Sequence, residues 1–104
     1  MELDKAAAGF AAMGAAPRLD VLRYLVKAGD AGLQVGEIAA RTGMAASTLA
    51  HHLKALQSAE LITQETQGRA TINRANYQHL EALAGYILNE CCLDSRTIGD
   101  VKNG

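Results

Sequence analysis

The chain has 104 residues, of which 49% are apolar and only 4% aromatic, and its formal net charge is −1. This length fits one domain, and the scarcity of aromatic residues argues against a β-sandwich or barrel and favours helices. The near-zero charge excludes a basic surface over the whole molecule, although segment 16–74 holds seven basic against five acidic residues, a local charge of +2. We therefore expect a single, mainly α (α+β) domain over residues 1–104, and the charge of its middle segment permits an acidic partner.

The sequence offers no membrane anchor. No segment reaches the roughly 18 consecutive apolar residues that a membrane span needs. The opening stretch MELDKAAAGF lacks the pattern of a signal peptide, because acidic residues flank its only lysine and its apolar run is interrupted. We expect a cytoplasmic protein with no membrane partner.

Two helices are predicted in the first third of the chain. Apolar residues at helical spacing favour a helix over residues 3–14. Pro17 suits the first turn of a second helix. The apolar face of that helix is formed by Leu19, Leu22, Leu25 and Val26. The turn-forming segment 29–32 ends it.

A helix-turn-helix is predicted over residues 35–56. A short helix over residues 35–41 is followed by the turn Thr42-Gly43-Met44. Two helices that cross closely need a small residue at their contact, which Ala39 supplies. The turn needs a residue that tolerates a positive φ, which Gly43 supplies.

The second helix of this pair is expected to begin at Ala45 or Ala46, to end near Ser58 and to have two faces. Leu49, Leu53 and Leu56 recur at spacings of four and three, which marks a buried face. The polar candidates that lie off this face are Ser47, Thr48, His51, His52 and Lys54. Their hydroxyl, imidazole and ammonium groups can donate to base edges or phosphates of double-stranded DNA. Adjacent imidazoles on a helix diverge by about 100°, which favours DNA-contacting or structural roles for the histidines over shared metal binding.

After this helix, the residue pattern changes from one typical of helices to one typical of strands. Residues 61–66 and 69–73 form two short β-rich runs, and Gln67-Gly68 is the expected two-residue turn between them. A hairpin directly after a helix-turn-helix is a wing, here over residues 61–73. Arg69, beside the tip, is expected to reach the adjacent minor groove or its phosphates.

A last helix is predicted over residues 76–92, with Asn76 as its N-cap. His79 is expected to be solvated or to contact a second copy of the chain. Cys91 and Cys92 are adjacent and are the only two cysteines. A thiolate pair is a soft ligand set that suits trivalent arsenic or antimony, Cu(I) or Zn(II). The alternative for these thiols is a small, buried apolar role.

Several phrases of the chain resemble the arsenic-repressor (ArsR/SmtB) family. They are residues 35–39 (VGEIA), 47–56 (STLAHHLKAL), 59–62 (AELI), 68–69 (GR) and 16–22 (APRLDVL). The resemblance covers roughly residues 10–92. It implies a winged helix-turn-helix of about five helices with a two-stranded wing, and a homodimer joined through the first and last helices, 3–14 and 76–92. It also implies a repressor of operator DNA that is released by an inducer and requires no cofactor. No Ser/His/Asp set or phosphate loop is visible, so we expect no enzyme.

The resemblance limits which inducer we expect. The family's Cys-x-Cys site on the third helix is replaced by Gln34-Val35-Gly36, and the last helix lacks the second histidine of the family's zinc site. Other members end the last helix in a cysteine pair, some with a third cysteine in the tail, where this chain has Ile98. The favoured inducer is a trivalent arsenical or antimonial held by Cys91 and Cys92. Two alternatives stay open: a repressor triggered by thiol oxidation or persulfide, and a winged-helix module that binds proteins and not DNA.

Overall fold

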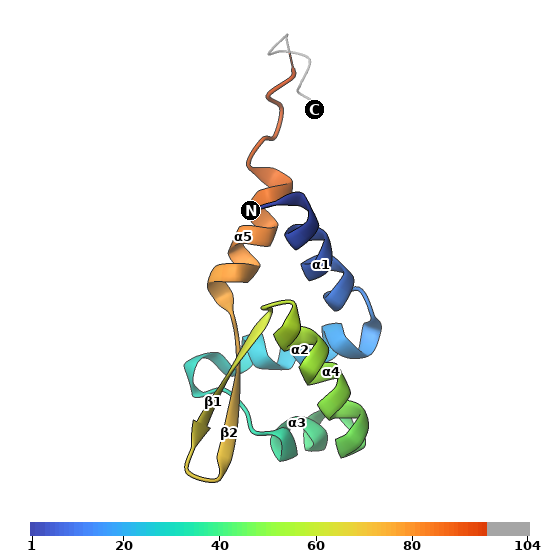
Figure 1. Cartoon of the computed structure of the whole chain (residues 1–104), viewed down its shortest axis with the longest axis vertical. Coiled ribbons are helices and arrows are strands. Elements are labelled where there is room, and N and C mark those ends of the chain that lie inside the picture. Colours follow the sequence, from blue (N-terminus) through green and yellow to red (C-terminus); the bar gives the residue numbers. More distant parts are fainter. Residues whose placement is uncertain (96–104) are drawn as a thin grey trace.

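The computed structural model describes residues 1–95, which form five α-helices, one 3₁₀ turn and one antiparallel hairpin (Figure 1). In chain order the elements are α1 (Leu3–Met13), α2 (Ala16–Ala28), η1 (Gly29–Ala31), α3 (Val35–Thr42), α4 (Ala46–Ser58), β1 (Ile62–Gln67), β2 (Ala70–Ala75) and α5 (Tyr77–Leu88). The predicted architecture, five helices with a two-stranded wing, is confirmed. No helix of the described part is long and apolar enough to cross a membrane.

The core lies where α2, α3, α4 and the beginning of β1 meet, and buried residues of α1 and α5 extend it. Its largest fully buried apolar side chains are Leu25, Ile38, Leu49, Leu56, Leu61, Ile62 and Leu83. The predicted apolar face of α2 is only half correct: Leu22 and Leu25 are buried, but Leu19 and Val26 are each 42% exposed. Because such side chains gain by leaving water, α2 offers apolar surface that this single chain does not cover.

The wing (residues 62–75) is a hairpin whose register pairs Ile62 with Ala75 and Gln67 with Ala70. Its turn is therefore Gly68-Arg69, so the predicted turn, Gln67-Gly68, is wrong by one residue. Gly68 has a φ of 62° and occupies the first of the two turn positions, where type II′ turns place glycine. The shift moves Arg69 from beside the tip to the tip itself.

Helix α5 packs on α1 at the upper end of the molecule (Figure 1). Asn76 caps it, as predicted: its Oδ1 accepts a hydrogen bond from the backbone N–H of His79 at 3.4 Å. The contact with α1 is close, because a Cβ atom on Gly9 would lie 2.8 Å from Cδ1 of Leu83. Gly9 thus lets the two helices approach.

Two expectations for α5 are wrong. The helix ends at Leu88, four residues before the predicted end, so Cys91 and Cys92 lie in the turns that follow it. His79 is only 8% exposed, so it is neither solvated nor available to a second copy. Ile98 lies outside the described residues.

Candidate nucleic-acid interface

The crossing of α3 and α4 is fixed at both ends of α3. At its start, Gln34 and Glu37 form a capping box, in which the backbone N–H of Gln34 donates to Oε1 of Glu37 at 2.8 Å. At its end, Gly43 adopts the left-handed conformation (φ 76°) and its N–H donates to the carbonyl of Ala39 at 2.9 Å. The chain can therefore turn and begin α4 only three residues later.

Helix α4 has the two faces that the spacing of its leucines predicts. Leu49, Leu53 and Leu56 are buried in the core. Ser47, His51 and Lys54 are exposed, and at 100° per residue they share the opposite side of the helix. We call these three residues the polar face of α4. Thr48 is also exposed and lies on the flank of this face.

The structure separates His52 from that face. His52 is half-buried, and its Nδ1 is shielded from solvent with no hydrogen-bond partner within residues 1–95. Its ring centroid is 6.0 Å from that of His51, with the planes tilted by 57°. The two imidazoles therefore point in different directions, and only His51 shares the exposed side with Lys54.

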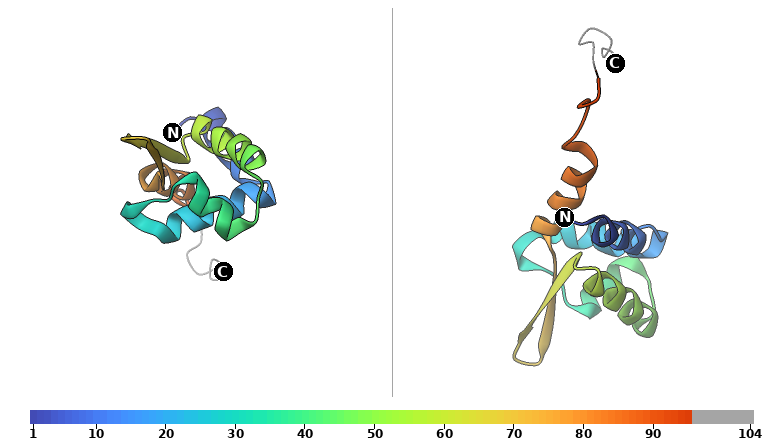
Figure 2. Two further views of the ribbon diagram at one scale, coloured as in Figure 1. Left: turned by 90° about the horizontal axis from the view of Figure 1, so that it is seen from below. Right: turned by 45° about the horizontal axis from the view of Figure 1, so that its top comes forward.

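The wing extends at the same end of the molecule as α3 and α4. Seen from below, the three elements lie side by side (Figure 2, left). Arg69 is exposed at the wing tip. The exposed polar side chains of α4 and the positive charge of Arg69 therefore lie at the same end of the molecule.

Two polar residues of β2 that no sequence motif marks, Asn73 and Arg74, anchor the wing to the segment before α3. Asn73 is fully buried: its Nδ2 donates to the carbonyl of Leu33 at 3.1 Å, and its Oδ1 accepts from Nε2 of Gln64 at 2.8 Å. Leu33 and Asn73 also exchange two backbone hydrogen bonds of 2.9 Å. The wing is therefore held at a fixed angle to the helices.

Arg74 makes the second attachment. Its Nε donates to the carbonyl of Asp30 at 2.6 Å, and its Nη1 contacts Oε1 of Glu65 at 2.5 Å. The hydrogen bond from Arg74 is the main reason that the pKa of Glu65 is lowered, so this carboxylate stays ionised and paired. A polar residue at an inward strand position, as Asn73 is, is the only hint of these anchors in the sequence.

The two cysteines lie in the turns that follow α5. Helix α5 lies at the opposite end of the molecule from α3, α4 and the wing (Figure 1). Both are exposed, and their Sγ atoms are 3.2 Å apart without a disulfide. The hydrogen bond and charge of Cys91 raise the pKa of the Cys92 thiol. Within residues 1–95, no group of three or more His, Cys, Asp or Glu side chains is placed to hold a metal ion, so the pair supplies two ligands only.

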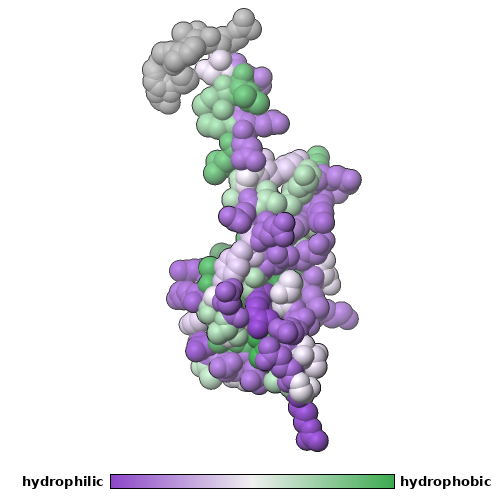
Figure 3. Space-filling view, turned by 90° about the vertical axis from the view of Figure 1, so that its left-hand side faces the viewer, coloured by the Kyte–Doolittle hydropathy of each residue, from purple (hydrophilic) through white to green (hydrophobic). Residues whose placement is uncertain are grey.

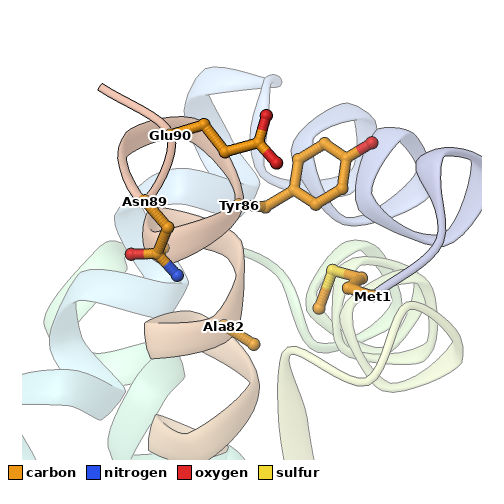
Figure 4. Close-up of a pocket in the computed structure, with 6 residues that line it drawn as sticks. Met1, Ala82, Tyr86, Asn89 and Glu90 are labelled. Carbon is orange, nitrogen blue, oxygen red and sulfur yellow. The ribbon is translucent and has the colours of Figure 1, made fainter. Parts of the chain in front are cut away.

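A hollow of about 550 Å³ lies beside the end of α5 (Figure 4). Met1 from the beginning of the chain and Ala82, Tyr86, Asn89 and Glu90 from α5 and the turn after it line this hollow. In the surface view, apolar atoms gather around the end of α5, while polar atoms dominate around the wing (Figure 3). The exposed large apolar residues of this helix are Tyr77, Tyr86, Ile87 and Leu88.

Comparison with known proteins gives matches to sequence families and to solved structures. A family model described as a helix-turn-helix domain matches residues 17–65. No curated protein matches the chain. An ArsR-like transcriptional regulator from Rhodococcus has 25% identity and a TM-score of 0.79, over 96% of this chain and 92% of that chain. The homodimeric winged helix-turn-helix DNA-binding domain of a possible ArsR-family regulator from Mycobacterium bovis has 26% identity and a TM-score of 0.67, over 91% and 88%. HlyU from Vibrio cholerae has 26% identity and a TM-score of 0.68, over 88% and 99%.

Proposed function

The chain is a winged helix-turn-helix transcriptional regulator of the ArsR/SmtB type, and from that premise we propose that it is a homodimeric repressor released from operator DNA by a thiophilic ligand. The DNA-binding part of this proposal rests on one observation: the polar face of α4 is exposed beside the positive charge of Arg69 at the wing tip. Ser47, His51 and Lys54 present donors that fit base edges and phosphates of the major groove. Arg69 would then reach the neighbouring minor groove.

The proposed dimer rests on the exposed apolar residues of α5. His79 and Leu83 are buried in the protomer, but Tyr77 in the first turn of the helix and Ile87 and Leu88 in its last turn are 38%, 62% and 65% exposed. An uncovered apolar stripe of this kind marks an interaction surface, and the Mycobacterium neighbour is itself homodimeric. We propose that α1 and α5 of two copies pair, which would set two α4 helices on half-sites about 34 Å apart.

The proposed trigger is the pair Cys91 and Cys92. Two exposed sulfurs 3.2 Å apart are close enough to bind one soft atom together. Because they lie three and four residues after the end of α5, a ligand there can alter the pairing of the dimer helices. A trivalent arsenical or antimonial that needs only two sulfurs from the protein fits this arrangement, with oxidation or persulfide formation as the alternative trigger.

DNA binding is tested by fluorescence anisotropy on the promoter of the protein's own gene. The observed binding constant should fall steeply with salt. Arg69→Ala and Lys54→Ala should each reduce the salt slope by about 1 per subunit. Lys5→Ala is the matched control, because it removes one cation from α1, where Lys5 pairs with Glu60 across 3.1 Å. No binding to this or any other duplex at low salt would leave the protein-interaction module as the function.

The trigger is tested on the same complex. Phenylarsenite or methylarsenite should release the DNA, and arsenite should act weakly, because the described site offers two sulfurs. Cys91→Ser and Cys92→Ser should bind DNA and resist release. Release by an oxidant alone would support the redox alternative, and normal release of both variants would eliminate any role for the pair.

A further inference from the structure

A groove runs between the helix-turn-helix and the wing, and the proposed function leaves it without a role. Its volume is about 410 Å³. Val35 of α3 and Ala50 of α4 contribute its apolar floor, and Lys54, Gln57, Gln64 and Thr71 contribute its polar sides. The two helices form one wall and the wing forms the other, so the groove lies between the polar face of α4 and the tip with Arg69.

We propose that this groove holds the phosphodiester backbone of one DNA strand, with Gln57 and Thr71 as hydrogen-bond donors to its phosphates. The inference rests on the proposed function. If α4 lies in a major groove and Arg69 in the next minor groove, the strand that separates these two grooves must pass between α4 and the wing. The groove occupies that position.

The chemistry of the groove matches such a strand. Lys54 supplies a positive charge, and Gln57 and Thr71 supply neutral N–H and O–H donors. No acidic residue of the described chain lines the groove. The pocket between α2 and α3 differs, because Glu37 lies there beside Lys27 and Arg41 and opposes an anion. The apolar floor, with Val35 and Ala50, can pack against deoxyribose rings.

The wing side of the groove is held in place. Nε2 of Gln64 donates to the buried Oδ1 of Asn73 at 2.8 Å, and Asn73 is in turn bonded to Leu33. The two walls therefore keep a fixed separation. A site that is organised before binding loses less entropy when the strand enters it.

The test measures the dissociation constants of Gln57→Ala and Thr71→Val for the operator and for an unrelated duplex. Each variant should weaken both by about the same factor, roughly tenfold, because a hydrogen bond to a charged phosphate is lost and every sequence has that phosphate. The salt slope should stay unchanged, because both side chains are neutral. The matched controls Gln78→Ala, on α5, and Thr63→Val, an exposed β1 residue outside the groove, should bind as the unmodified protein does.

A methylphosphonate scan of the operator then locates the contact. One neutral linkage should weaken binding of the unmodified protein and have no further effect on Gln57→Ala. A loss confined to the operator would mean base reading and would overturn the phosphate assignment. Unchanged affinity of both variants would also overturn it, while leaving the proposed function intact. An unmodified protein that binds no duplex would remove both.

Discussion

Replacing Asn73 by alanine should destabilise the protein by about 2–3 kcal/mol. The side chain is fully buried and makes two hydrogen bonds, of 3.1 Å to the carbonyl of Leu33 and of 2.8 Å from Gln64. Each such bond contributes about 1 kcal/mol, and the space left by the amide adds a smaller term. This is a large part of the 5–15 kcal/mol that separates a typical domain from its unfolded state.

The assay is urea unfolding at one fixed protein concentration, because association would shift the midpoint. Gln67→Ala is the control: its Nε2 also donates a side-chain hydrogen bond in the wing, to Glu65 on the same strand at 3.3 Å, but this bond is exposed to solvent. The substitution should therefore change the free energy of unfolding by less than about 0.5 kcal/mol. Hydrogen exchange at the N–H groups of Leu33 and Asn73 should also accelerate. Equal free energies for the two variants would refute the idea that the buried amide fixes the wing.

Three other substitutions probe other parts of the molecule. Gly32→Ala should destabilise the protein by more than Gly29→Ala: both replace a glycine at a similar positive φ, which costs about 1–3 kcal/mol of backbone strain, but only at Gly32 would the Cβ also lie 2.6 Å from a carbonyl oxygen of β2; equal urea midpoints would contradict this. Leu83→Ala should cost about 3 kcal/mol and lower the dimer fraction in size-exclusion chromatography, and an unchanged elution and midpoint would argue against α5 docking. Cys91→Ala should speed alkylation of Cys92 at about pH 8, because the neighbour that raises the pKa of this thiol is gone; an unchanged rate would exclude that cause.

Local chemistry made much of this fold predictable. The leucines at 49, 53 and 56 locate α4, because a helix that buries one face must repeat at three and four residues. Gly43 marks the turn through its positive φ, and Asn76 marks the start of α5 through its side-chain cap. Both features act within a few residues, so the sequence shows them directly.

The sequence-based predictions were wrong where contacts between distant residues determine the local structure. A glycine next to the tip allows two hairpin registers, and the strand pairing selects the one with Gly68 in the first turn position. Helix α5 ends at Leu88 without a glycine or proline to mark the end. The burial of His79 depends on which elements cover it, and the hydrogen bond that anchors the wing joins Asn73 to Leu33, which lie 40 residues apart in sequence.

The exposed apolar residues of α5 have a consequence for how repression depends on the amount of protein. Leu83 packs within the protomer, while Ile87 and Leu88, in the last turn of the helix, are exposed and available to the proposed second copy. If only the dimer binds the operator, operator occupancy rises with the square of the protomer concentration when that concentration is below the dissociation constant of the dimer. A small drop in synthesis of the protein would then sharply reduce occupancy of the operator. Dimerisation through α5 would therefore give repression a concentration threshold.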